Sequence, residues 1–485
     1  MSVSQDLGSV AKLNVMCNPS KLNFLMLSPA FGLDKDCHLP NMCRHIFRNT
    51  IYGFSGKVSD SDLAKVQNCI PNAVYYKEAN QVVHKAEDDE FWHPREAPLR
   101  RSTAPRGRRL VGSVTSIPEM RAYEESVKTS GSEGAPIDPS EVTGGVSMFS
   151  AGTKSESTKP LLWNLDRLDQ RPLPLDGVYH FGTASTRGTG NGTTVYVVDS
   201  GIKKGHQEFQ RWDGSGTRAS YGYDFVDGDE DCDDCDGHGT HVAATAVGLS
   251  VGVAKDADVV SVRILDCDGS GSISNTVAAL DWVAANHKAP AVVTLSLGIQ
   301  VGSWSRVLED AVSALINQHG ITVVVAAGNS AVDACYVAPA NVKDALSVAA
   351  SDVKARYGGG EADSSAQPDA VYQWTNSGPC VKIFAPGVDI YSACGGASRC
   401  ATVDDRSYTY ASGTSMAVPH VAGVAAIYLE SYPQSSPAEV SAAILNGATQ
   451  NSVNTTGLTA NTPSKLIYSR LMGGEAAAVQ AANGP

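Results

Sequence analysis

The chain has 485 residues and a formal net charge of −13. This length exceeds one ordinary domain, so two or three folded units are expected. The acidic balance argues against a nucleic-acid-binding protein, which would carry a basic stripe. No apolar run is long enough to cross a bilayer, so we expect no membrane partner.

The cysteines bear on the compartment of the protein. There are 11 cysteines, and Asn191 and Asn454 each begin an Asn-X-Thr triplet that can accept a glycan. Both features favour an extracellular or organelle-lumen protein. Residues 1–30 nevertheless lack a basic start followed by a long apolar run, so no signal peptide is visible. Either the true start is missing from this sequence, or export uses another route.

Residues 21–84 have the pattern of a small α/β unit. Ser59 is placed to cap a helix in which Leu63, Val66 and Ile70 recur on one face. Four segments are expected to be strands, of which the last two close the unit: residues 22–27, 52–58, 74–76 and 81–83. The pattern alone indicates only a small α/β domain.

Residues 85–160 have the composition of a linker, rich in Ser, Gly, Pro and charge, with little periodicity. Their arginine-rich part, residues 94–110, contains Arg100-Arg101 and Arg106-Gly107-Arg108-Arg109. It is either a solvated basic patch or a processing site for a trypsin-like or convertase-like enzyme. At the other end of the chain, residues 472–485 are rich in Ala and Gly and are expected to be a disordered tail.

Residues 161–471 alternate apolar runs with helix-like stretches. The strand-like runs are residues 259–265, 292–297 and 321–326, and the helix-like stretches are residues 276–286 and 304–318. This alternation predicts an α/β domain in which helices cover both faces of a mostly parallel sheet.

Three positions of this domain suit acyl transfer. Asp199 ends an apolar run at the carboxyl end of a strand, where open α/β sheets place their sites. His238 lies between glycines at the start of a small-residue helix. Ser415 begins an apolar helix, with Pro419 expected in the first turn, where a missing N–H costs little. A Gly-Thr-Ser string is also an ordinary helix cap.

These residue types complement one another chemically. The Ser415 hydroxyl needs a base, and a histidine has a suitable pKa for that role. On chemistry alone either His238 or His241 could serve, and Asp199 could hold the tautomer and stabilise the imidazolium. An aspartate, a histidine and a serine at element ends are the parts of a nucleophilic triad.

The motifs Asp199-Ser200-Gly201, His238-Gly239-Thr240-His241 and Gly413-Thr414-Ser415-Met416-Ala417 resemble the three signatures of subtilisin-like serine proteases. The resemblance is strongest to the proteinase K and aqualysin branch. It implies a subtilisin-like fold for residues 161–471. It also implies a serine endopeptidase of broad specificity, which hydrolyses peptide bonds through an acyl-enzyme intermediate and works as a monomer.

The resemblance also assigns roles to single residues. Asp199, His238 and Ser415 become the triad, in that chain order. His241 is then a buried helix residue. Asn329, which follows a glycine as many turn residues do, takes the position of the oxyanion donor.

Two segments match the family's substrate-lining strands, Gly269-Ser270-Gly271 and Ser296-Leu297-Gly298. Such exposed strand edges let a peptide add as an extra strand. Ile299 stands where relatives commonly carry a second glycine. A branched side chain at this position would narrow the first substrate pocket. Residues 21–84 resemble the family's inhibitory prodomain, which implies a zymogen whose prodomain tail occupies the cleft.

Six cysteines of residues 161–471 are expected to form disulfides. The resemblance implies the pairs Cys235–Cys267 and Cys335–Cys380, and a short separation favours Cys394–Cys400. Cys232 is then left over. The alternative is a set of free thiols in a reduced protein, but cysteine usage follows compartment and favours the disulfides.

Residues 227–234 contain alternating acids that suit calcium, although most acidic loops are simply solvated. Relatives near proteinase K hold a calcium ion with two backbone carbonyls and one aspartate. Lys382 stands at that aspartate position, and an ammonium cannot ligate calcium. We therefore predict that this site is absent and that no cofactor is required.

Two other classes of function compete with a protease. A binding protein could be built on an inactive protease fold, but all four catalytic positions are filled here. A hydrolase acting only on esters is disfavoured by the two peptide-binding edges.

Overall fold

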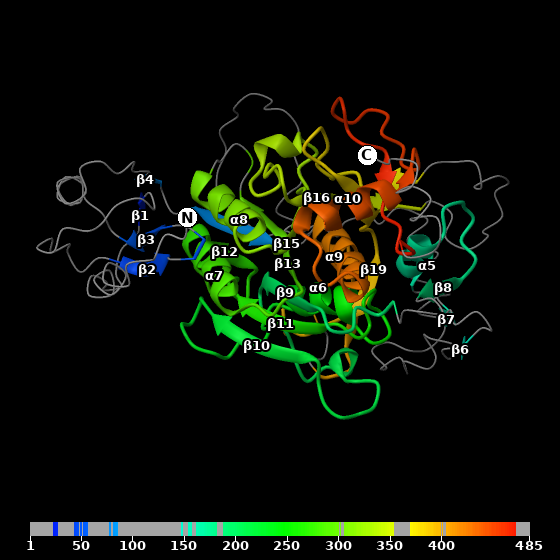
Figure 1. Cartoon of the computed structure of the whole chain (residues 1–485), viewed down its shortest axis with the longest axis horizontal. Helices are drawn as coiled ribbons and strands as arrows, with labels where there is room; N and C mark the ends of the chain where they lie inside the picture. Colours follow the sequence, from blue (N-terminus) through cyan, green and yellow to red (C-terminus); the bar gives the residue numbers. More distant parts are fainter. Residues whose placement is uncertain are drawn as a thin grey trace, which may run out of the picture.

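The computed structural model describes most of the expected α/β domain and several strands before it (Figure 1). The described residues are 49–50, 81–85, 162–181, 188–299, 301, 305–353, 369–398, 400 and 404–471, with the backbone alone for 23–27, 43–47, 52–56, 77–78, 147–148 and 154–157. The helix expected from Ser59, the arginine-rich stretch and the tail 472–485 lie outside these residues.

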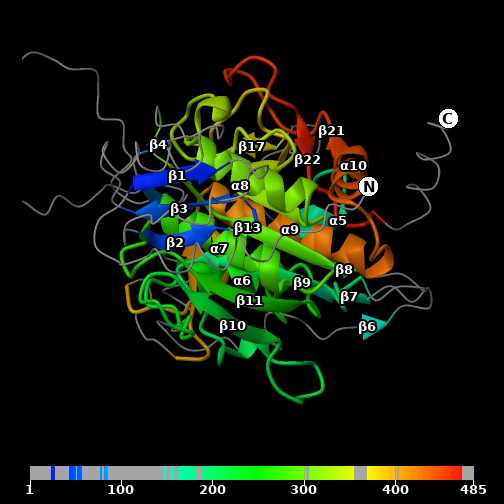
Figure 2. The same ribbon diagram turned by 60° about the vertical axis from the view of Figure 1, so that its left-hand side comes forward.

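A ten-stranded sheet forms the centre of the domain (Figures 1 and 2). In spatial order its strands are β10 (Ala219–Asp224), β11 (Asp258–Arg263), β9 (Thr194–Asp199), β13 (Ala291–Leu295), β15 (Thr322–Ala326), β16 (Leu346–Asp352), β18 (Ile383–Pro386), β22 (Lys465–Leu466) and β21 (Thr449–Gln450), with β17 (Ala370–Val371) beside β16. All neighbours from β10 to β22 are parallel, whereas β21 and β17 pair antiparallel. The mostly parallel sheet is confirmed.

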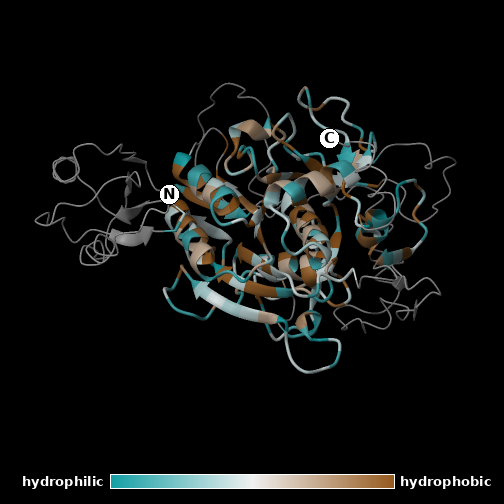
Figure 3. Ribbon diagram, viewed as in Figure 1, coloured by the Kyte–Doolittle hydropathy of each residue, from teal (hydrophilic) through white to brown (hydrophobic). Residues whose placement is uncertain are grey.

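Helices cover both faces of this sheet. The helices are α5 (Trp163–Asp169), α6 (His238–Val247), α7 (Ile273–Asn286), α8 (Arg306–Asn317), α9 (Thr414–Ser431) and α10 (Pro437–Gly447), with short 3₁₀ turns η2 (Gln207–Phe209) and η3 (Ala334–Tyr336). Along β9, Val195 and Val197 pack with α6 and α9, whereas Tyr196 and Val198 pack with α7 and α8. This alternation is that of a strand with a core on each side. In Figure 3 the ribbons of the central strands and of the helices over them are largely brown, the colour of hydrophobic residues.

Two expected elements have different bounds in the structure. Helix α7 begins at Ile273, earlier than expected, because the Ser272 side chain caps it by accepting from the Asn275 N–H. The strand expected at 292–297 divides at Ser296 into β13 and β14 (Leu297–Ile299). β14 leaves the main sheet there and pairs with a different strand.

The strands before the domain form a separate antiparallel sheet. Its order is β2 (Cys43–Phe47), β3 (Tyr52–Gly56), β1 (Asn23–Leu27) and β4 (Lys77–Glu78). β1 and β3 confirm two of the expected strands. β2 was not predicted, and β4 lies just after the strand expected at 74–76.

The prediction that the segment 81–83 closes this unit is wrong. The segment forms β5 (Val82–Lys85), which instead lies between β12 (Ser270–Ser272) and β14 in a three-stranded sheet. The edges of β12 and β14 offer unpaired backbone groups and are separated by the width of one strand, so β5 can pair with both.

Further strands complete the molecule. β6 (Ser147–Met148) and β7 (Lys154–Ser157) form a three-stranded sheet with β8 (Val178–Phe181), and β19 (Ile390–Ala393) pairs with β20 (Tyr408–Ala411). The end of the expected linker therefore pairs with the domain. Among the described residues, no helix is both long and apolar enough to span a membrane.

The three expected disulfides are confirmed. They join Cys235 to Cys267, Cys335 to Cys380 and Cys394 to Cys400. Cys232 is a buried free cysteine, and burial raises the pKa of its thiol to about 12. A thiol with such a pKa stays protonated at neutral pH and is a weak nucleophile.

Loop length predicts that these disulfides contribute unequally to stability. Cys335 and Cys380 are 45 residues apart, whereas Cys394 and Cys400 are 6 apart. By restricting the unfolded chain, Cys335–Cys380 should stabilise the fold by about 4 kcal/mol and Cys394–Cys400 by about 2 kcal/mol. In a Ser415→Ala background, which should prevent self-digestion, replacing the long-loop pair by serines should lower the free energy of unfolding more than replacing the short-loop pair. Equal losses in denaturant melts would contradict the chain-entropy account.

Candidate active site

Two parallel strands bring the candidate catalytic residues to one edge of the sheet. Asp199 is the last residue of β9, and Asn329 follows β15. His238 and Ser415 are the first and second residues of α6 and α9, the helices that lie on one face of that sheet. The carboxyl edge of a parallel sheet is where such folds place their sites.

His238 and Asp199 form a buried, short contact. His238 Nδ1 lies 2.6 Å from Asp199 Oδ1, and the two side chains are 0% and 1% exposed. The same Asp199 oxygen accepts from the Ser200 N–H at 2.8 Å. With the proton on Nδ1, the aspartate fixes the ring orientation and leaves Nε2 as the basic nitrogen.

Asp234 holds the turn that carries His238 and was not singled out from the sequence. One of its oxygens accepts from the Ser200 hydroxyl at 2.9 Å and from the Gly237 N–H at 2.8 Å. The other accepts from the Thr240 N–H at 2.9 Å and hydroxyl at 2.6 Å. Burial raises the pKa of Asp234, and the hydrogen bonds from Thr240 and Gly237 oppose that rise. In the sequence this position is only one member of an acidic loop.

Ser415 is joined to Ser296, which belongs to one of the expected substrate segments, by two reciprocal hydrogen bonds. Its hydroxyl donates to the Ser296 carbonyl at 2.9 Å, and the Ser296 hydroxyl donates to the Ser415 carbonyl at 3.0 Å. Pro419 explains the second bond. It lies inside α9 rather than in the first turn as expected, so the Ser415 carbonyl has no helical N–H donor at that position. Ser296 supplies the donor instead.

Asn329 is held beside the same helix start. Its side-chain Oδ1 accepts from the Thr414 N–H at 2.9 Å, and the Gly328 N–H donates to the Thr414 hydroxyl at 3.2 Å. Because Oδ1 is engaged next to Ser415, the Nδ2 amide is the group that can donate to a reacting oxygen. The other histidines have structural contacts: His241 Nε2 meets the Ile390 carbonyl at 2.9 Å, and burial lowers the pKa of His420 to about 4.

The two expected substrate segments face each other across β5. Gly271 pairs with Val83, and Gly298 pairs with His84, both in antiparallel register. Lys85 reaches past them to Asp236, with Nζ 2.8 Å from Oδ1. Neither Lys85 nor Asp236 stands out as a site residue in the sequence, where the two lie 151 positions apart.

Two acids of residues 227–234 form ion pairs with basic side chains of the protein. Asp227 pairs with the Arg263 guanidinium at 2.8 Å, and Asp233 pairs with Lys203 at 3.5 Å. Within the described part of the chain, His, Cys, Asp and Glu side chains form no group of three or more that could hold a metal ion. Lys382 lies next to β18 with its N–H donating to the Ser347 carbonyl. An ammonium side chain offers no oxygen to calcium, so Lys382 cannot serve as a ligand at this position.

The Pro419 and Ser296 arrangement generates a stability prediction. Ser296→Ala leaves the buried Ser415 carbonyl without its hydroxyl donor, which should cost about 1–3 kcal/mol. Pro419→Ala supplies an N–H at that position, so the double variant should lose less than Ser296→Ala alone. Denaturant unfolding in the Ser415→Ala background measures this cycle. Additive losses would contradict a shared acceptor.

Comparisons with known proteins identify the family of this chain. Residues 190–463 match the Peptidase S8 subtilase family. The chain is 44% identical over 308 residues to the alkaline serine exoprotease A of Vibrio alginolyticus, covering 64% of this chain and 50% of that protein. It is 44% identical over 309 residues to the extracellular serine proteinase of Thermus sp. strain Rt41A, covering 64% of this chain and 66% of that protein.

A solved structure shows the same fold. A cold-adapted subtilisin-like serine proteinase matches with a TM-score of 0.53 and 41% identity, over 64% of this chain and 98% of that chain. The chain thus spans between half and two thirds of the two curated relatives, and nearly all of the solved one. The family match covers more than half of the 485 residues, and the chain belongs to the subtilase family.

Proposed function

We propose that this protein is a serine endopeptidase that hydrolyses peptide bonds in protein and peptide substrates. The observation that carries the proposal is the buried Asp199–His238 pair at the sheet edge where Ser415 and Asn329 also lie. A peptide strand, β5, already lies along the neighbouring strand edges. All four residues come from one chain, so a monomer can form the complete candidate site.

The reaction follows from the positions of these groups. Ser415 Oγ leaves the Ser296 carbonyl, gives its proton to His238 Nε2 and attacks the substrate carbonyl carbon. Asn329 Nδ2 and the Ser415 N–H donate to the oxyanion, and Asp199 stabilises the imidazolium. The imidazolium then protonates the leaving amine as the peptide C–N bond breaks. Water, deprotonated by His238, hydrolyses the acyl-enzyme and frees Ser415.

We further propose that the segment before the domain is an inhibitory prodomain. β5 occupies the edges that a substrate would use, and Val83 is buried in the core that includes α7 and α8. A second contact lies on α7, where Asp281 Oδ1 accepts from the backbone N–H of Asn49 at 2.6 Å and of Thr50 at 2.9 Å. Two separate contacts favour a unit that docks on the enzyme.

The proposed compartment is extracellular or an organelle lumen. Three disulfides are stable in an oxidising environment, and the Thermus relative is named an extracellular proteinase.

An inactive scaffold is the rival function, and active-site labelling separates the two. A fluorophosphonate should modify the activated hydroxyl of Ser415 in the processed protein, and Ser415→Ala should abolish both labelling and peptide hydrolysis. Peptide hydrolysis retained in that variant, free of other proteases, would refute the assignment.

Asn329→Ala tests the oxyanion role. Loss of one such donor should lower kcat by about 10²–10³ with little change in KM, because the donor acts on charge that develops in the transition state. Asn286→Ala, at an exposed asparagine that ends α7, is the control and should retain wild-type kinetics. A change in KM alone would instead indicate a role in substrate binding.

Neighbouring valines of β5 test the inhibitor role. Added in trans, residues 1–86 should inhibit the mature enzyme at micromolar concentration. Val83→Glu should weaken that inhibition at least about tenfold, because it buries a carboxylate in an apolar core. Val82 is 52% exposed, so Val82→Glu should have little effect. No inhibition by the unchanged segment would refute the prodomain proposal.

A further inference from the structure

One side chain of β5 enters a slot beside the candidate catalytic residues. Lys85 Nζ lies 2.8 Å from Asp236 Oδ1, and the two side chains are only 6% and 2% exposed. Asp236 precedes His238 by two positions, so the ion pair borders the proposed base. A charge buried this well is costly without its partner, so each group favours an opposite charge at the other position.

The opposite wall of the slot is a glycine. Gly269 has a φ of +73°, and a Cβ atom there would meet Lys85 Cε at 2.5 Å and Cδ at 2.6 Å. The methylene stem of the lysine therefore runs directly over the Gly269 backbone, and a larger residue would close the slot. The Lys85 main chain follows the same wall, because its N–H donates to the Gly269 carbonyl at 3.3 Å.

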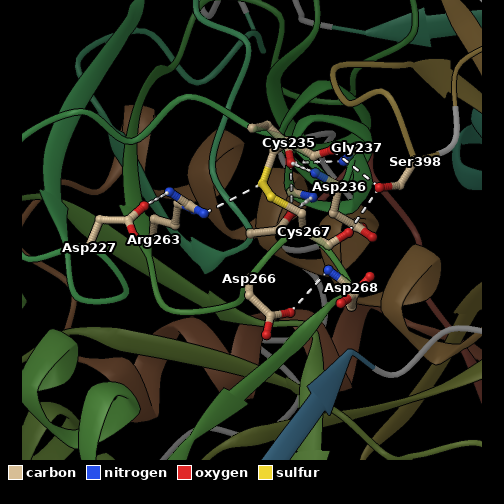
Figure 4. Close-up of a disulfide and its surroundings, with 12 residues drawn as sticks. Asp227, Cys235, Asp236, Gly237, Arg263, Asp266, Cys267, Asp268 and Ser398 are labelled. Carbon is tan, nitrogen blue, oxygen red and sulfur yellow. Dashed lines mark hydrogen bonds and ion pairs between the residues drawn. A yellow bond between two sulfur atoms is a disulfide. The ribbon is translucent and has the colours of Figure 1, made fainter.

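A disulfide fixes the two walls relative to each other. Asp236 directly follows Cys235, and Gly269 lies two positions after Cys267, the residue to which Cys235 is bonded (Figure 4). The second Asp236 oxygen accepts from the His238 N–H at 3.0 Å, which leaves Oδ1 to meet the ammonium. The carboxylate is thus oriented by the protein, and a preorganised group binds its ligand at a lower entropic cost.

The register of β5 identifies the substrate position that would meet this slot. Lys85 lies opposite Leu297, so the next residue of a strand in the same register comes level with Ser296. The Ser296 carbonyl accepts from Ser415 Oγ at 2.9 Å. A substrate in this register would therefore present to Ser415 the carbonyl of the residue that follows the slot.

We propose that Asp236 is a specificity residue that selects lysine at the second substrate position before the scissile bond. This inference rests on the protease function proposed above. The Lys85 side chain, bound from the chain's own prosegment, occupies the place that a substrate lysine takes. A neutral side chain there removes the ammonium that Asp236 Oδ1 contacts in this structure, and an acidic one adds repulsion.

Two peptides that differ only in the ammonium group test the proposal. They are acetyl-Val-His-Lys-Ala, which has the sequence of residues 83–86, and acetyl-Val-His-norleucine-Ala, each as a para-nitroanilide. With the purified protein made from the full chain, kcat/KM for the lysine peptide should exceed that for the norleucine peptide about tenfold or more. Asp236→Asn should bring this ratio close to one. The side-chain amide of the variant retains an oxygen that can accept the hydrogen bond from the His238 N–H.

Asp268→Gln is the matched control. Asp268 is an exposed acid next to Gly269, and its loss removes the same charge near the slot without removing the contact to the ammonium. Its ratio should stay at the wild-type value. Because each ratio compares two peptides on one protein, partial misfolding of a variant cancels.

The outcomes separate this inference from the proposed function. Equal cleavage of both peptides by the wild-type protein would refute the slot and leave the protease assignment intact. A ratio that falls equally in Asp236→Asn and Asp268→Gln would also refute it, since general surface charge would then be the cause. Cleavage of neither peptide or any other peptide would refute the protease function, and the slot with it.

Discussion

The close packing of α6 against α9 is the constraint on which the site depends. Both helices lie on the same face of the sheet, with His238 and Ser415 at their starts. The approach requires a glycine, because a Cβ atom at Gly423 would meet the Ala246 carbonyl oxygen at 2.9 Å and Val253 Cβ at 2.6 Å. A side chain there would push the helices apart. The distance between the proposed base and nucleophile would then change with no change at the site itself.

Several charges are buried in and around this site, and each is stabilised by specific partners. Asp199 faces His238, Asp234 accepts hydrogen bonds from Ser200, Gly237 and Thr240, and Asp236 pairs with Lys85. Removing such a partner costs more than the contact itself contributes, because it leaves a desolvated charge. The acids are therefore parts of an ordered framework, and this framework orients His238.

In the function proposed here, inhibition and substrate recognition use the same surface. β5 satisfies the backbone groups of two strand edges, while Val83 and Lys85 fill an apolar and an acidic environment respectively. A prosegment that binds in this way displays the side chains that the cleft prefers. Under this proposal, the side chains of β5 also indicate which substrate side chains the cleft prefers.

Two of the cysteine pairs followed only from the resemblance to subtilisin-like proteases. The sequence by itself determined the α/β class and the order of the candidate catalytic positions. Local patterns carry these features: β9 and β15 are uninterrupted apolar runs because both of their faces are buried, and the motif residues follow at their ends. Only the tertiary structure decided the features that join distant segments. β5 leaves its own unit because two strand edges meet elsewhere, and the Ser415 carbonyl, which Pro419 leaves without a helical donor, takes one from Ser296. Lys85 and Asp236 are 151 positions apart, and no periodicity along the chain connects them. Their contact exists because folding brings a strand edge, a glycine and a disulfide together around one ammonium group.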